Sequence, residues 1–204
     1  MIAVSTIPRL ENGDRLTQVE FERRYHAMPQ LKKAELINGI VYMGSPLRIN
    51  QHGEPHAFIL SWLGLYLASH NDLQLGDNCI VRLDPDNEPQ PDVLLRKRSG
   101  GTSTISADGY VAGPPELIVE IAASTVSLDM HHKRELYCRT GVQEYLVWRV
   151  EDGAIDWFEL VKGQYQRLQP NSVGLLCSKV FPGLKLDRTA LLMGNLAQVL
   201  AVLK

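Results

Sequence analysis

Hydrophobic and polar residues change period along the chain, and these changes outline the predicted elements. Thr17 and Glu20 have the spacing of a capping box, which predicts a short helix over 18–27 that Pro29 ends. Two apolar runs flank Asn38-Gly39, a dipeptide typical of a two-residue hairpin turn, so a β-hairpin is expected over 34–43. Glu35 therefore lies on a predicted strand with apolar neighbours.

The next segment has one clear helical face. Pro55 suits a first helical turn, and the apolar residues after it recur at helical spacing: Phe58, Ile59, Trp62, Leu63, Tyr66 and Leu67. Asn71 and Asp72 interrupt this pattern. Short apolar runs at 79–83 and 92–95 predict strands on either side of a polar turn. Residues 99–113 contain four glycines and many small polar residues, which predicts a flexible loop.

The second half predicts strands around one helix. A strand is expected over 116–122, a helix over 128–140 that ends at Gly141, and paired strands over 144–150 and 155–161. Runs at 165–168 and 175–180 are candidates to extend the sheet. An apolar-rich helix is expected over 189–203, with Thr189 or Asp187 as its cap.

This order of elements, without a repeat or a linker, predicts one domain over residues 1–204. Its class is α+β or α/β, with a mixed central sheet. The chain is 45% hydrophobic and 22% charged, so it can bury a core. Apolar stretches fall short of the roughly 18 residues that span a bilayer, and the first ten residues lack the pattern of a secretion signal. No membrane association is expected.

Cysteine usage and charge restrict the setting further. The chain has three cysteines, an odd number without zinc spacing, which favours reduced thiols in a cytoplasmic protein. The net charge of −2 counts mildly against a strong nonspecific nucleic-acid binder, although a local basic patch could still carry binding. The dense basic clusters, 32–33 and 96–98, are most simply interpreted as solvated loop charge.

Two carboxylates lie inside short apolar runs and are candidates for chemistry. Glu120 lies within the run 117–122, and Asp92 follows Pro91, a residue that favours the ends and edges of strands. A buried ionised carboxylate is costly unless another group pairs with it. Carboxylates and main-chain carbonyls suit Mg²⁺, so a site formed by Asp92, Glu120 and the carbonyl of Ile121 is expected.

Three further residues could complete this site. Lys133, on the following helix, could reach back to a scissile phosphate, and Asp129 could pair with it one turn earlier. Glu35 could be an outer ligand. Each residue also has a simpler interpretation: Asp92 as a solvent-facing edge residue, Lys133 as part of a polar helix face, and Glu35 as an exposed hairpin residue. The whole set, in this order, favours metal-assisted phosphodiester cleavage.

Other chemistries find less support in the sequence. His52 and His56 resemble the zinc-protease pattern H-E-x-x-H, but Glu54 is in the wrong place and Pro55 prevents one regular turn. A zinc site is therefore disfavoured. The chain has no Gly-x-Ser-x-Gly motif, no Walker loop and no dinucleotide fingerprint.

In order and spacing, seven short motifs resemble the Uma2 family, a family of the PD-(D/E)XK nuclease superfamily that is abundant in cyanobacteria. The motifs cover most of the chain: AELING (34–39), QPDV (90–93), GPPELIVEI (113–121), ST (124–125) with Asp129, KRELY (133–137), GVQEY (141–145) and FPGL (181–184). The chain departs from the family where Ala122-Ala123 replaces a Ser-Pro pair.

The resemblance implies a restriction-endonuclease-like core, with a mixed sheet flanked by helices. Asp92 and Glu120 would bind Mg²⁺ or Mn²⁺, and Glu35 would assist. The superfamily lysine usually stands two residues after the second acid, where this chain has Ala122, so Lys133 would supply it from the next helix. Three secondary candidates are Asp129, Tyr137 and a family histidine that matches either His52 or His56.

The implied function is a metal-dependent endonuclease that hydrolyses phosphodiester bonds of DNA. The alternative is a noncatalytic binding or regulatory module that keeps the nuclease fold. A homodimer is expected by family analogy alone.

Overall fold

A six-stranded mixed sheet forms the centre of the computed structural model, which describes residues 7–44 and 47–203. The strand order is β11-β10-β9-β8-β5-β3, and only the pair β8–β9 is parallel. A parallel pair needs a long crossover, which the helical segment between the two strands provides. The strands are β3 (Leu73–Asp77), β5 (Val93–Lys97), β8 (Leu117–Ala122), β9 (Glu144–Arg149), β10 (Ala154–Val161) and β11 (Gln164–Arg167).

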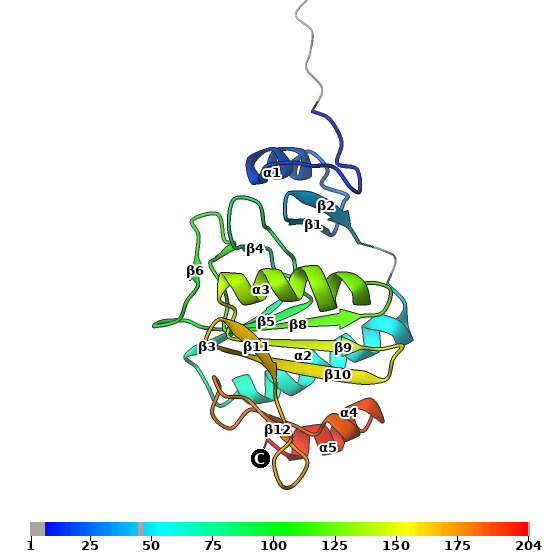
Figure 1. Ribbon diagram of the computed structural model, residues 1–204, viewed down its shortest axis with the longest axis vertical. Helices are drawn as coiled ribbons and strands as arrows, with labels where there is room; N and C mark the ends of the chain where they lie inside the picture. The colour runs from blue at the N-terminus through cyan, green and yellow to red at the C-terminus, as the bar shows by residue number, and fades with distance from the viewer. Residues whose placement is uncertain (1–6, 45–46, 204) are drawn as a thin grey trace, which may run out of the picture.

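Helices cover both faces of this sheet (Figure 1). One face packs against α2 (Glu54–Leu67), with α4 (Arg188–Leu192) and α5 (Leu196–Ala201) beside it. The other face packs against the crossover, formed by the π-helical turn η2 (Leu128–Lys133) and α3 (Arg134–Thr140). Alternate residues of a strand point to opposite faces, so Leu117 and Val119 face α2, whereas Ile118 faces α3. The predicted mixed sheet flanked by helices is confirmed.

A third layer lies over α3 and contains a hairpin of β1 (Ala34–Ile37) and β2 (Ile40–Met43), with α1 (Gln18–His26) beyond it (Figure 1). Thr17 caps α1 by accepting a hydrogen bond from the Glu20 amide. Asn38 and Gly39 both have positive φ (53° and 72°), as this hairpin turn requires. Another π-helical turn, η1 (Ile49–Gly53), leads into α2.

Two smaller sheets correct the sequence predictions. The run 79–83 contributes β4 (Val81–Arg82) to a separate three-stranded sheet with β6 (Thr104–Ile105) and β7 (Val111–Ala112). The expected flexible loop 99–113 therefore contains two short strands. In the run 175–180, β12 (Leu176–Cys177) pairs with β13 (Lys185–Leu186) and does not extend the central sheet, whereas β11 does.

The prediction of one continuous helix over 189–203 is also wrong, because the segment forms the two short helices α4 and α5. Gly194 separates them with φ of +70°, a conformation that ends a helix and suits glycine. Asp187 caps α4 by accepting a hydrogen bond from the Ala190 amide at 2.9 Å. Strand β3 was not predicted, because its residues lack an apolar run.

Two further findings bear on the expected setting. The three cysteines are free thiols, each of them half-buried. Among the described residues, the helices are too short or too polar to cross a membrane.

Candidate active site

Asp92 lies where the ladder between β5 and β8 stops. The last backbone pair is Val93 with Val119, and one step further the same register places Asp92 opposite Glu120. There the Asp92 carboxylate replaces the next backbone acceptor, since its Oδ2 accepts a hydrogen bond from the Ile121 amide at 2.8 Å. Because residues opposite each other share a face, Asp92 and Glu120 both lie on the α3 side of the sheet.

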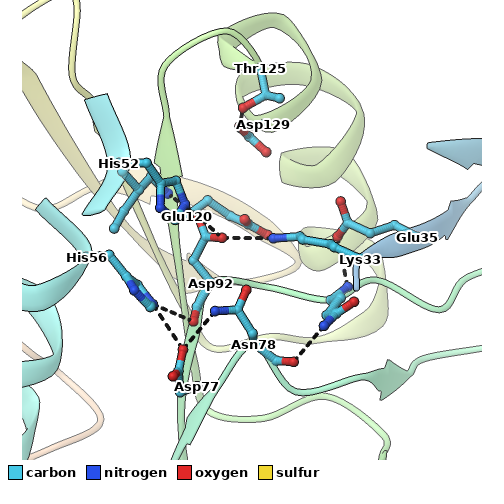
Figure 2. A network of polar contacts seen from close by, with 12 residues as sticks. Lys33, Glu35, His52, His56, Asp77, Asn78, Asp92, Glu120, Thr125 and Asp129 are labelled. Atoms are coloured by element: carbon cyan, nitrogen blue, oxygen red, sulfur yellow. Dashed lines mark hydrogen bonds and ion pairs between the residues drawn. The ribbon is translucent and has the colours of Figure 1, made fainter. Parts of the chain in front are cut away.

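The side chains of Lys33 and His52 contact the second carboxylate oxygen of Asp92, Oδ1. Oδ1 lies 2.8 Å from Lys33 Nζ and 3.2 Å from His52 Nε2 (Figure 2). Burial by itself would raise the pKa of Asp92, but the hydrogen bond from His52 and the charge of Lys33 outweigh it and hold the pKa below its usual range. Asp92 is therefore ionised at neutral pH.

Glu120 and Lys133 form the buried centre of the site. Glu120 Oε1 accepts hydrogen bonds from Lys133 Nζ at 3.0 Å and from the Tyr137 hydroxyl at 2.9 Å. The same ammonium lies 2.8 Å from Glu35 Oε1 and 3.6 Å from Asp129 Oδ1. The side chains of Glu120 and Lys133 are each only 3% exposed. One ammonium group thus joins carboxylates from the hairpin, the sheet and the crossover.

The π-helical turn η2 places Asp129 and Lys133 on the side that faces the sheet. Thr125 donates a hydrogen bond to Asp129 Oδ2 at 2.6 Å (Figure 2), and the Tyr145 hydroxyl donates to the Asp129 carbonyl at 3.0 Å. Both bonds hold Asp129, near the start of the turn, through its side chain and its main chain. Single π turns inside helices occur frequently at functional sites.

Burial and like charge shape the ionisation of this centre. Burial raises the pKa of Glu120 to about 8, with Lys133 opposing the shift and Asp129, Asp92 and Glu35 adding to it. Burial also raises the pKa of Asp129. Burial would lower the pKa of Lys133, but the surrounding carboxylates raise it, so its ammonium stays charged.

The site therefore contains more negative than positive groups. Four carboxyl groups (Glu35, Asp92, Glu120 and Asp129) surround two ammonium groups (Lys33 and Lys133). Since burial favours the neutral forms of Glu120 and Asp129, two negative charges become uncompensated once these acids lose their protons, as they would on binding a cation. Hard carboxylate oxygens and a charge deficit of this size fit a divalent cation such as Mg²⁺. In 7–44 and 47–203, no three His, Cys, Asp or Glu side chains lie close enough together to hold a metal ion as they stand. The ammonium groups of Lys33 and Lys133 occupy positions next to Asp92, Glu35 and Glu120.

The structure also locates Ile121 and its expected carbonyl ligand. The Ile121 amide points toward the β5 side, at Asp92. The carbonyl of the next residue, Ala122, points the other way and accepts from Val150 after β9. Since the N–H and C=O of one strand residue point to the same side, the Ile121 carbonyl also points to the β5 side of the strand.

All four principal candidates converge: Glu35, Asp92, Glu120 and Lys133. The interpretation of Asp92 and Glu35 as solvent-exposed residues is wrong, since Glu35 is 6% exposed and Asp92 is 3% exposed. Asp129 and Tyr137 lie within the same network. His56 does not face the Asp92 carboxylate, because its Nε2 lies 3.1 Å from both the main-chain oxygen of Asp92 and Asp77 Oδ1 (Figure 2). Of the two histidines, His52 is the one that contacts this carboxylate.

Sequence reasoning missed one residue of the site, Lys33, and left the family histidine undecided between His52 and His56. The basic pair 32–33 resembled solvated charge, and the sequence offered no way to choose between the two histidines. One signal was available for Lys33. It lies directly before β1 and two residues before Glu35, and residues two apart along a strand point to the same face.

The site opens into a cleft of about 610 Å³. Its floor contains Asp92, Glu120, Asp129 and Lys133, and its walls come from the hairpin, from η1 and from the segment after β8. The buried acids can thus be reached from one side.

A mixed sheet with opposed acids at the end of two strands and a crossover that supplies a lysine defines a restriction-endonuclease-like nuclease fold. The family model of Uma2, described as "Putative restriction endonuclease", matches residues 19–189. The chain therefore belongs to the Uma2 family.

A solved structure has the same fold. It is a protein from Anabaena variabilis ATCC 29413, described as a "putative nuclease belonging to DUF820". The TM-score is 0.63 at 15% sequence identity, and the alignment covers 85% of this chain and 97% of the other. No curated protein matches the chain.

Proposed function

We propose that the chain is a Mg²⁺-dependent endonuclease that hydrolyses phosphodiester bonds of DNA. The observation that carries the proposal is the convergence of Glu35, Asp92, Glu120 and Asp129 in one cleft with too few ammonium groups to balance them. A bound divalent cation supplies Lewis-acid stabilisation of charge on the phosphate and a more acidic water. Asp92, Glu120 and the Ile121 carbonyl are the proposed ligands, with Mn²⁺ as a substitute metal.

The two lysines take different parts in this proposal. Lys133 is confined between Glu120 and Glu35 and holds both carboxylates in place near the metal ligands. Its ammonium would also supply positive charge to a phosphate bound in the cleft, the role expected of the nuclease lysine. Lys33 is 24% exposed, pairs with Asp92 and lines the cleft, so it can attract the phosphate as it enters.

The test is plasmid nicking by purified protein with Mg²⁺ or Mn²⁺. Asp92→Asn and Glu120→Gln, which keep size and remove charge, should abolish nicking. Asp108→Asn is the matched control, because Asp108 is exposed and pairs with Arg82 outside the cleft. Equal cleavage by the wild type and both cleft variants would show that a contaminating nuclease, and not this chain, cuts the DNA.

One observation favours a second candidate, a noncatalytic binding or regulatory module with a nuclease fold. The Lys133 ammonium already lies between Glu120 and Glu35, where it balances part of the charge that a metal would balance. This alternative predicts no specific divalent-cation binding. Calorimetry with Mn²⁺ on the wild type and on Glu120→Gln separates the two, because only the nuclease proposal expects binding that the substitution weakens. A homodimer stays a prediction.

A further inference from the structure

The depth of the cleft limits which form of DNA can reach the acids. Asp92 and Glu120, on its floor, are only 3% and 2% exposed. A scissile phosphate must therefore enter the cleft and cannot react from a flat surface. A cleft of about 610 Å³ has the size of a site for a drug-sized ligand, which covers roughly 300–1,000 Å³, so a nucleotide base can enter it.

A continuous duplex can bring its backbone to such a site but cannot turn a base into it. Duplex DNA is stiff, with a persistence length of about 50 nm, and specific duplex binding buries about 1,000–2,500 Å² of protein surface. An unpaired strand is flexible and can turn a single nucleotide into a pocket. Enzymes that act on groups inside a duplex use this route by extruding the nucleotide.

The wall of the cleft carries apolar and aromatic side chains next to the acids. Tyr42 lies directly opposite Glu35 across the hairpin, so both side chains share one face. Met43 and Leu47 also line the cleft, and Leu47 is 69% exposed. Nucleotide bases stack on aromatic side chains regardless of sequence, and the half-buried Tyr42 is the aromatic residue of this wall, with Met43 and Leu47 as apolar neighbours. The bases of a duplex, already stacked, cannot use this surface.

Cationic side chains flank the same wall. Lys32 and Arg48 are exposed, Lys33 is half-buried, and all three line the cleft. Glu151 is the acidic residue of the rim, where it accepts a hydrogen bond from Gln51 at 2.9 Å. The whole chain has a net charge of −2, so its basic groups offer a short phosphate track at this cleft and not the broad basic surface typical of duplex binders.

We propose that the cleft binds an unpaired segment of a DNA strand, with a base against Tyr42 and Leu47 and the phosphates along Lys32, Lys33 and Arg48. The inference rests on the proposed function only for the cleavage step. It makes single-stranded, frayed or bubble DNA the preferred substrate of the nuclease over the interior of a continuous duplex.

The binding test is fluorescence anisotropy in EDTA, which prevents metal-dependent cleavage. The probes are a labelled oligothymidine of about 12 nucleotides, within the site sizes of single-strand binders, and the same strand annealed to its complement. The single strand should bind at least about tenfold more tightly at equal salt, which corresponds to one stacked base.

Two pairs of variants connect this preference to the cleft. Tyr42→Ala should weaken single-strand binding by about 5- to 100-fold, and Tyr42→Phe should restore it. Arg48→Ala should weaken binding and reduce its salt dependence, whereas Arg98→Ala should not, because Arg98 is an exposed arginine beyond the opposite end of β5. Leu47→Ala replaces Tyr42→Ala if the latter unfolds, since Leu47 is exposed.

Equal affinity for the two probes, or variants that weaken both equally, would overturn the inference. A cleavage assay with Mg²⁺ on circular single-stranded DNA and on relaxed plasmid separates it from the proposed function. Single-strand binding without any cleavage would support the inference and refute the nuclease. Equal cleavage of both substrates would support the nuclease and refute the inference.

Discussion

Replacing Lys133 with methionine should destabilise the fold strongly, because it leaves buried carboxylates without their shared cation. The ammonium lies 2.8, 3.0 and 3.6 Å from Glu35, Glu120 and Asp129. Removing one partner of a buried ion pair costs about 3–5 kcal/mol. For a chain of this size, each kcal/mol lowers the melting temperature by about 2–4 °C, so a decrease of about 6–20 °C is expected.

The assay is thermal unfolding followed by circular dichroism at pH 7. Lys179→Met is the matched control, because the Lys179 side chain is exposed; it should change stability by no more than about 0.5 kcal/mol. Adding Glu120→Gln to Lys133→Met should restore part of the loss, since it removes one of the unpaired charges.

The effect of pH tests the electrostatic origin of this loss. In Lys133→Met, the buried acids should have folded-state pKa values raised above their unfolded values, which lie near 4. A group of this kind stabilises the fold below its unfolded pKa and loses that contribution as pH rises through its folded pKa. The deficit of Lys133→Met should therefore shrink as pH falls. A melting temperature equal to that of Lys179→Met at pH 7 would refute the ion network described here.

Two further predictions concern regions outside the cleft. Gly194→Ala should destabilise the chain by about 1 kcal/mol, because Gly194 has φ of +70° between α4 and α5. Gly64→Ala should stabilise it by up to about 1 kcal/mol, because Gly64 lies in the middle of α2 and a Cβ there meets open space. Urea midpoints measure both changes, and equal shifts would contradict the conformational argument. Burial, reinforced by Glu22, raises the pKa of Glu88 to about 8, so its contribution should be present below pH about 4 and be lost as pH rises to about 8. Glu88→Gln should flatten this part of the stability profile, and an unchanged profile would show that Glu88 does not titrate in this range.

Much of the fold could be predicted because its elements depend on short stretches of chain. Asn38-Gly39 specified the hairpin, since both residues tolerate positive φ. The run that contains Glu120 indicated a buried strand, and all six residues of β8 are buried. The predictions failed where pairing depends on distant segments: β12 has the apolar character of a sheet strand, but its partner is β13.

The candidate site divides in the same way. The sequence indicated Asp92 and Glu120, because an acid in an apolar run is unusual at any position. It did not indicate Lys33, which lies 59 residues from Asp92 in the chain yet binds it at 2.8 Å. Nor did it select between His52 and His56, because that choice depends on how η1 and α2 meet the end of β5.

The amino-acid sequence by itself determined the family, most of the elements and the acidic residues of the site, since periodicity, turn dipeptides and isolated charges act over a few residues. Only the tertiary structure decided which cations balance which acids, which histidine contacts the Asp92 carboxylate and how deep the cleft is. These properties depend on the desolvation of groups from separate elements, and burial gives such groups their paired charges and shifted pKa values only when the layers have packed.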